Sequence, residues 1–304
     1  MKKHYFQQLA EIKTNTYLFN FETKYIKLYS NLIIFFCLLN ILILSPDIFE
    51  IFAKDGLIKE SINVEFIYPY NPLLNWFTSP LTYIGIPYRV SLLLVITIYM
   101  ISLVFNLINY KKLTFAIIAW FFHIAIINSS YFFSYGADYF LTFALFINIF
   151  FSIPSKKLNQ KQVKTIHSFI IRFTQIQMCF VYFFAGFGKS LGADWFDGNA
   201  IWYILNSFSP KITESFFYHF IDYPLFFIFL GWSTVLIELL YTILMNLKIT
   251  RKVTLLSIIS LHLGIIFFMK FYTFGLIMII LNLIAWGDYL FDYKRVTKLN
   301  YKTY

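Results

Sequence analysis

This sequence has little charge. Charged residues make up 13% of the 304 residues, whereas 59% are hydrophobic and 22% are aromatic, and the mean hydropathy is +0.67. A water-soluble domain could not cover so much apolar surface with so few charges, so the composition excludes that class of protein. The chain is therefore expected to lie in a lipid bilayer.

Several motifs are also absent. The two cysteines, Cys37 and Cys179, fall in apolar stretches where a free thiol behaves as a small hydrophobic group, so neither predicts a disulfide or a metal site. No histidine pair has metal-ligand spacing, and no Gly-rich phosphate loop or Ser/His/Asp or Cys/His arrangement occurs, so metal binding, phosphoryl transfer and acyl transfer have no support. The alternating pattern of an outer-membrane barrel is missing as well.

What the sequence does have is long apolar runs. A spanning helix needs roughly 20 mostly apolar residues, and its backbone polar groups must be paired internally, which favours helices. The fold class expected is an all-α integral membrane protein of about eight transmembrane helices. The predicted spans are 28–46, 89–109, 113–131, 137–153, 168–188, 224–246, 253–269 and 271–287.

The basic residues give this bundle an orientation. Most of the 25 Lys and Arg residues fall before the first span, after alternate spans or in the C-terminal tail, so both ends are expected on the cytoplasmic side. Topology and anionic lipid heads account for the net charge of +10, and no nucleic-acid partner is expected. The basic residues left for the outer face are Lys54, Lys59, Arg89, Lys189, Lys211 and Lys270.

The chain is expected to form one membrane domain, 28–287, between a cytoplasmic arm, 1–27, and a cytoplasmic tail, 288–304. The first apolar run ends in Ser45-Pro46-Asp47 and not in a small-residue cleavage site, so the first span should remain as an anchor. Richness in Lys, Asn, Ile and Phe suggests an AT-rich bacterial genome and a multi-pass protein of the bacterial inner membrane.

Two outer segments, roughly 47–88 and 190–223, are long enough to fold back on the membrane. The second contains the apolar stretch 200–205, and then Phe216, Phe217 and Phe220 after Thr213. These stretches could form short interfacial helices. They could equally be ordinary residues of an aromatic belt.

Ionisable groups at membrane depth are costly, so they are candidates for function. Glu238 lies well inside the sixth span, His262 near the middle of the seventh and His123 near the middle of the third. Glu238 could instead be a protonated or paired residue that fixes helix packing. The histidines could serve packing, or could handle protons or contact a quinone.

Lys189 stands at the outward end of the fifth span, after Ala185, Gly186 and Gly188, which allow another helix to approach closely. Partial desolvation there would disfavour the ammonium form, and a neutral amine could act as a base. The alternative is a lysine that snorkels to the outer interface. Arg89, Asp138 and Lys270 end at the same outer level and could line an outward-opening cavity with Lys189.

At this segment the sequence resembles the vitamin K-dependent gamma-carboxylase family and its bacterial relatives, the horizontally transferred transmembrane (HTTM) domain proteins. Their pattern reads approximately Tyr-Phe-x-Ala-Gly-x-x-Lys, then Asp-Trp-x-x-Gly, and this chain has one extra residue before Asp-Trp. The matching residues are Tyr182, Phe183, Ala185, Gly186, Lys189, Asp194, Trp195 and Gly198. The stretches around Glu238 and His262 also resemble motifs of the family, as does, more weakly, the stretch 110–143. All of them occur in the same order as in the family.

The resemblance implies that Lys189 is the base that deprotonates a reduced quinone, vitamin K hydroquinone or menaquinol. The pocket residues it implies, together with those from membrane depth, are Glu238, His262, Asp138, Asp194, Trp195 and Arg89. A neutral amine can accept the proton of a phenolic hydroxyl, and an apolar pocket protects the resulting reactive anion from water. No metal is expected.

Two departures separate this chain from the carboxylases. Where the family has Asn-His-Ser-Tyr, this chain has Asn128-Ser129-Ser130-Tyr131, and it ends at Tyr304 without the large soluble domain that presents glutamate-rich substrates. A second hypothesis is therefore a non-catalytic HTTM protein, similar to sporulation-delaying protein B, that helps to mature or export a small secreted antimicrobial peptide. A transporter is a third, weaker one, because the polar residues form no continuous path.

Overall fold

The computed structural model describes residues 23–53, 56–57, 70–154, 158–208, 217–220 and 222–291. These residues form helices and turns, and no strand occurs among them. Most of the predicted arm, 1–27, and of the predicted tail, 288–304, lies outside the described residues. The chain divides into two compact units, Met1–Ile170 and Ile171–Tyr304.

Each predicted span coincides with a helix, so the all-α prediction is confirmed for the described residues. Six helical stretches are long and apolar enough to cross a membrane, whereas α8 and α14, with 16 and 15 residues, are shorter. This supports a multi-pass α-helical membrane protein. The helices are α2 (Thr23–Leu44), α6 (Tyr88–Leu107), α7 (Lys112–Ser129), α8 (Gly136–Phe151), α9 (Gln160–Ser190), α12 (Pro224–Asn246), α13 (Arg251–Met269) and α14 (Tyr272–Trp286).

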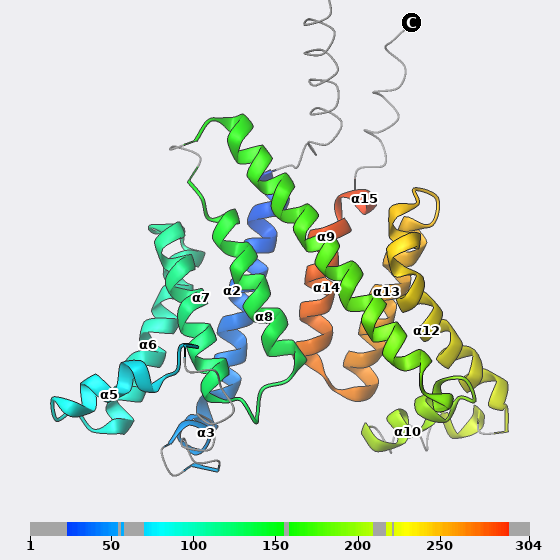
Figure 1. Ribbon diagram of the computed structural model, residues 1–304, viewed down its shortest axis with the longest axis horizontal. Helices are drawn as coiled ribbons and strands as arrows, with labels where there is room; N and C mark the ends of the chain where they lie inside the picture. Colours follow the sequence, from blue (N-terminus) through cyan, green and yellow to red (C-terminus); the bar gives the residue numbers. More distant parts are fainter. Residues whose placement is uncertain are drawn as a thin grey trace, which may run out of the picture. The chain divides into compact units, whose positions relative to one another are not determined.

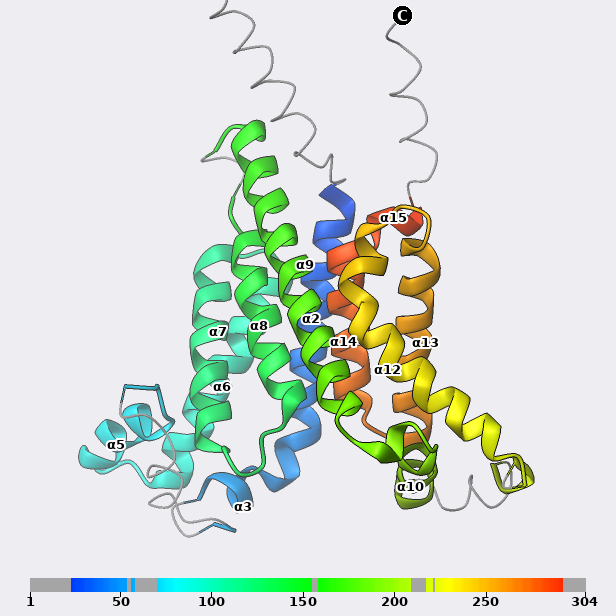
Figure 2. The ribbon, with the colours of Figure 1, turned by 45° about the vertical axis from the view of Figure 1, so that its right-hand side comes forward.

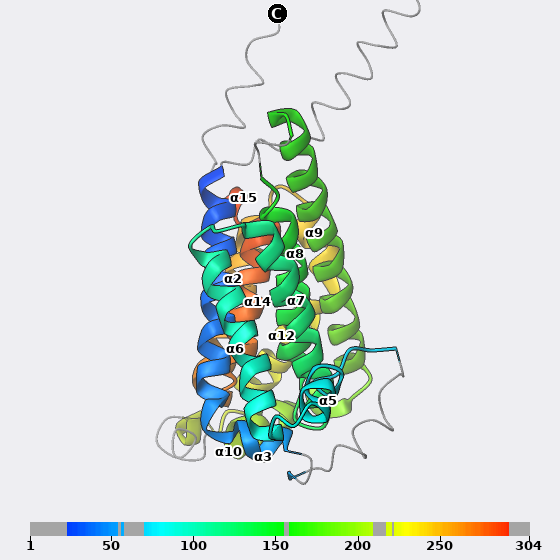
Figure 3. The same cartoon turned by 90° about the vertical axis from the view of Figure 1, so that its left-hand side faces the viewer.

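The first unit is a bundle of α2, α6, α7 and α8. α2 packs against α6 and α8, and α7 packs against the same two helices, so each helix has two neighbours (Figure 1). The short helices η1 (Ser45–Asp47), α3 (Ile48–Phe52) and α5 (Asn75–Tyr83) lie at one end of this bundle (Figure 3). The chain before α5 is tied to the end of α7, because Leu74 N–H donates to Ser129 Oγ at 2.8 Å.

A buried asparagine joins three helices of this bundle. Asn148 of α8 is fully buried. Its Oδ1 accepts a hydrogen bond from Ser30 Oγ of α2 at 2.6 Å, and its Nδ2 donates to Asn106 Oδ1 of α6 at 3.3 Å. Because Asn148 is fully buried, its amide needs such protein partners.

Asn148→Leu should therefore lower the free energy of unfolding by roughly 1–3 kcal/mol, since it leaves the Ser30 hydroxyl and the Asn106 carbonyl unpaired. Ser30→Ala removes one hydroxyl and one bond, so its effect should be smaller. Unfolding midpoints of the purified protein in detergent would measure both. If Asn148→Leu were as stable as wild type, the Asn148 hydrogen bonds would not stabilise the bundle.

The second unit contains the part of α9 after Ile170, and α12, α13 and α14. α13 packs against α12 and α14, and α10 (Asn199–Phe208) packs against the ends of α12 and α13 (Figure 2). The short helices are η2 (Ala193–Trp195), η3 (Phe217–Phe220) and α15 (Asp288–Phe291). Leu205 of α10, Phe217 of η3 and Phe227 of α12 form an apolar cluster that holds these three helices together.

The segment 190–223, which the sequence predicts to be on the outer side, is thus partly helical in its described residues. α10 covers the predicted stretch 200–205, and η3 includes Phe217 and Phe220, whereas Thr213 and Phe216 lie outside the described residues. Trp202 and Phe220 pack against the apolar cluster at the start of α12. Their placement at a membrane interface stays a prediction.

Candidate functional site

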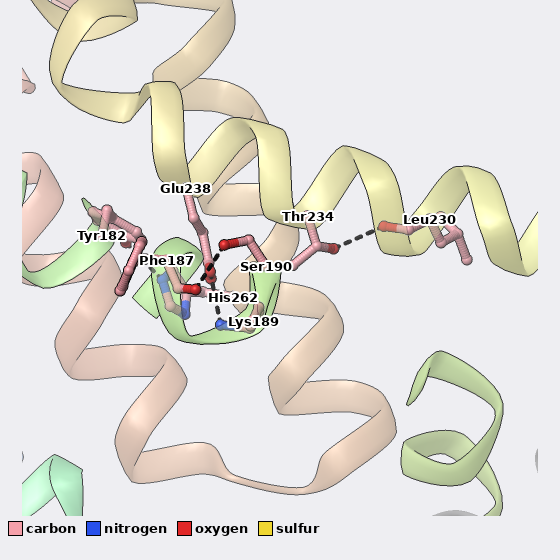
Figure 4. A network of polar contacts seen from close by, with 8 residues as sticks. All are labelled: Tyr182, Phe187, Lys189, Ser190, Leu230, Thr234, Glu238 and His262. Carbon is pink, nitrogen blue, oxygen red and sulfur yellow. Dashed lines mark hydrogen bonds and ion pairs between the residues drawn. The ribbon is translucent and has the colours of Figure 1, made fainter. Parts of the chain in front are cut away.

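Lys189 and Glu238 form an ion pair. Lys189 lies in the last turn of α9 and Glu238 in the middle of α12, and the distance from Lys189 Nζ to Glu238 Oε2 is 2.7 Å (Figure 4). The Glu238 side chain is 6% exposed and the Lys189 side chain 25% exposed. Two opposite charges in so apolar a setting neutralise one another, which explains how both are tolerated there.

A close helix crossing creates this pair. A Cβ on Gly186 would lie 2.6 Å from Leu239 N and 2.9 Å from Glu238 Cβ, so only glycine lets α9 approach α12 at this point. Lys189 follows Gly186 by three residues and therefore projects from nearly the same face of α9. The sequence prediction that the small residues admit another helix is borne out at Gly186, whereas Gly188 faces open space.

The chain after α9 places an aromatic ring over the amine. η2 follows directly, and the Trp195 ring centroid lies 5.4 Å from Lys189 Nζ, within the range of a cation–π contact. Gly231 of α12 makes room for this turn, because a Cβ there would collide with the carbonyl oxygen of Trp195. Trp232 Nε1 also donates to Phe196 O at 3.2 Å. The turn is thus fixed to α12 at two successive residues.

A second polar contact lies about two turns before Lys189 along α9. His262 of α13 is 2% exposed, and its Nε2 is 2.7 Å from the hydroxyl of Tyr182. That hydroxyl also accepts from Asn282 Nδ2 of α14 at 2.7 Å, and Tyr241 of α12 donates to Asn282 Oδ1 at 2.8 Å. Four helices of the second unit therefore share one buried network, and Figure 4 shows His262 beside the Lys189–Glu238 pair.

The sequence predicted some of these contacts and missed others. It singled out Lys189, Glu238, His262 and Trp195, and the structure brings all four to one end of α9. Tyr241 and Asn282 were missed. A lone asparagine in the apolar run Leu281-Asn282-Leu283 is a signal that could have indicated the second residue.

The other predicted pocket residues stand apart from the amine. Asp194 is exposed, and it is the neighbouring Trp195 ring that meets Lys189. Lys270 is exposed at the end of α13, with a left-handed φ of 58°. Both side chains are exposed, and neither takes part in the contact between Lys189 and Glu238.

Arg89 and Asp138 belong to the first unit. Arg89 is exposed, with its Cζ 5.4 Å from the ring centroid of Phe49. Asp138 lies in the first turn of α8, where its Oδ2 accepts a hydrogen bond from the backbone N–H of Tyr135 at 2.9 Å. This contact caps the helix and satisfies a backbone donor. A cavity shared with Lys189 stays a prediction for both.

The arrangement in the second unit can hold a proton in either of two places. The pair can exist as an ammonium beside a carboxylate, or as a neutral amine beside a carboxylic acid. A low-dielectric setting reduces the free-energy difference between the charged and the neutral form of the pair, because each charge loses its hydration there. The neutral form is the one that can accept a proton from a ligand hydroxyl.

No protein-family model matches this chain, and neither a curated protein nor a solved structure matches it. Any function must therefore be inferred from the residues and the geometry of the site.

Proposed function

We propose that this chain is a membrane protein of the vitamin K-dependent gamma-carboxylase-like, HTTM type, in which Lys189 and Glu238 exchange a proton with a reduced quinone. The observation that carries the proposal is the 2.7 Å ion pair, whose carboxylate is 6% exposed and lies in α12, a helix long and apolar enough to cross a membrane. Ionisable residues inside a membrane are retained mainly for function. The pair uses the lysine and the acid that the family resemblance had indicated.

The proposed topology has eight spans with cytoplasmic ends. Six helical stretches have the length to cross, and α8 and α14 would complete the set. Helices of 15 or 16 residues rise about 23 Å, which is less than the roughly 30 Å hydrocarbon core, so their flanks would have to thin the bilayer locally. With a cytoplasmic N-terminus, the end of the fifth span, and with it Lys189 and Trp195, would face the periplasm or exterior. A reporter fused after Trp195 that proved cytoplasmic would overturn this topology.

The surroundings of the pair suit a quinone ring. Phe183 and Phe187 stack on the exposed face of α9 with centroids 6.3 Å apart, and Trp195 lies over the amine. Such rings provide apolar, stacking surfaces for an aromatic head group. A reduced quinone would supply an acidic phenolic hydroxyl. Lys189 as neutral amine would accept that proton and become an ammonium, and the quinol anion formed would balance its charge. Glu238 in its acid form would keep its own proton and stay within hydrogen-bond distance of Lys189.

The quinone assignment predicts what copurifies with the protein. Lys189→Met should lower the amount of bound quinone roughly tenfold or more, because a hydrogen bond to a charged group is lost. Glu238→Gln should weaken it too, since the lysine loses its partner. Mass spectrometry of extracted quinones measures both. Lys252→Met, which removes an exposed lysine from the start of α13, is the matched control.

Quinone content equal to wild type in a folded Lys189→Met protein would refute this assignment. Equal loss in Lys252→Met would show that the effect is one of total charge and not of the site.

One observation favours the non-catalytic alternative, a helper in maturation or export of a secreted peptide. The position of the family histidine is Ser129, and its hydroxyl accepts a hydrogen bond from Leu74, which gives it a structural role here. The ion pair would then serve only to join α9 and α12. A Lys189→Met/Glu238→Leu variant that keeps the cellular phenotype would support this alternative, whereas loss of the phenotype in a folded protein supports proton exchange.

A further inference from the structure

A groove between α9 and α12 lies on the side of their crossing that faces the start of α9. It has a volume of about 580 Å³. The two helices approach closely at Gly186, where a Cβ would meet the backbone of Leu239, and Leu239 also lines the groove. Its lining residues are Arg172, Gln175, Ile176, Cys179, Phe180, Phe183, Leu239, Thr242, Ile243, Asn246 and Trp286.

The groove is polar at one end and apolar along the rest. Arg172 and Asn246 lie at the polar end, with Gln175, which is 4% exposed and accepts a hydrogen bond from Arg172 Nη1 at 2.7 Å. From there the wall continues over Ile176, Phe180 and Phe183 on α9. A ligand that fits must therefore carry a polar head and one apolar tail.

The polar end carries positive charge from two helices. Arg251, at the start of α13, lies over Trp286, which lines the groove, with 5.5 Å between its Cζ and the ring centroid. Arg251 also stacks on Tyr289, with 3.9 Å between its Cζ and the ring centroid, and donates to Met245 O at 2.7 Å. Guanidinium groups match the geometry of phosphate oxygens, and Arg172 is the one that lines the groove.

The length of the groove indicates which lipid it suits. From Arg172 to Phe183 the helix rises about 16 Å at 1.5 Å per residue, which is about half of the roughly 30 Å hydrocarbon core. The groove therefore spans one leaflet. Because basic residues collect on the cytoplasmic side, the proposed topology places its polar end in the leaflet that holds anionic lipids.

We propose that this groove binds one anionic phospholipid, with the phosphate at Arg172 and an acyl chain along Ile176, Phe180 and Phe183. The ion pair lies beyond the helix crossing, and Phe183 is the residue that the groove shares with the surface proposed for the quinone ring. The lipid would hold α9 and α12 together on the side where they diverge. The proposal rests on charge and shape, and it stands whether or not a quinone binds at Lys189.

Native mass spectrometry of the full chain tests the proposal, with phosphatidylglycerol and phosphatidylcholine of the same acyl chains added in detergent. Wild type should retain phosphatidylglycerol preferentially. Arg172→Gln should weaken its retention roughly tenfold, and Ile176→Trp should displace it by filling the groove. Lys252→Gln and Val253→Trp, which alter exposed positions on α13, should retain it.

Equal retention of the two lipids by wild type would overturn the anionic head group. Undiminished phosphatidylglycerol in Arg172→Gln, or in Ile176→Trp, would overturn the site itself. The phospholipid proposal would also be overturned if wild type retained a quinone in place of the phospholipid and Ile176→Trp no longer retained that quinone. Because Ile176 is 56% exposed, its replacement leaves the core intact and keeps the test decisive if Arg172→Gln fails to fold.

Discussion

Lys189→Met should lower the free energy of unfolding by roughly 3 kcal/mol, the low end of the range for removing one partner of a buried ion pair. The low end applies because the Lys189 side chain keeps 25% exposure, whereas Glu238, at 6%, is left alone in an apolar setting and must take up a proton. Unfolding of the purified protein in detergent, followed by tryptophan fluorescence, would measure the loss.

The order of the variants is part of this prediction. Glu238→Leu should cost less than Lys189→Met, because a lone lysine near the helix end can turn its amine toward water. The double variant should recover most of the loss, since replacing both partners by apolar residues is often neutral. Losses that simply add in the double variant would contradict a direct pair. Lys252→Met should be close to wild type.

Gly186→Ala should separate α9 from α12 and lower the free energy of unfolding by roughly 1–3 kcal/mol, the usual cost of overpacking. The added methyl would meet the backbone of Leu239 and the Cβ of Glu238, and neither atom is at the end of a flexible side chain. The same movement would lengthen the 2.7 Å contact between Lys189 and Glu238. Quinone retention should therefore fall with stability.

Gly188→Ala is the matched control on the same helix. A Cβ at Gly188 meets nothing within 4 Å, and alanine is a better helix former than glycine by about 1 kcal/mol. This variant should be as stable as wild type or more stable. If the two alanine variants behaved alike, the close crossing at Gly186 would not be what holds the site together. Unfolding midpoints measured side by side decide between these results.

The two experiments together separate structure from chemistry. If Lys189→Met/Glu238→Leu is stable and yet loses quinone, the pair acts on a ligand. If it is stable and keeps both quinone and cellular phenotype, the pair only joins helices, as the peptide-maturation alternative requires.

The sequence by itself determined the helices and marked the charged candidates. Long apolar runs can satisfy their backbone groups in lipid only as helices, so the helices were predictable. Their bounds were less so, since α9 begins at Gln160, eight residues before its predicted span. Glu238, His262 and Lys189 were identifiable because charge is rare in such runs. The short lengths of α8 and α14, 16 and 15 residues, agree with the shorter apolar runs there.

Only the tertiary structure decided which candidates meet. Glu238 is 49 residues from Lys189 and His262 is 80 residues from Tyr182 in the chain, and apolar periodicity carries no information about which face of one helix meets which face of another. The crossing at Gly186 sets that choice, because backbones approach closely only where no Cβ intervenes. The crossing gave Lys189, which the sequence predicted as a base, a carboxylate partner in Glu238.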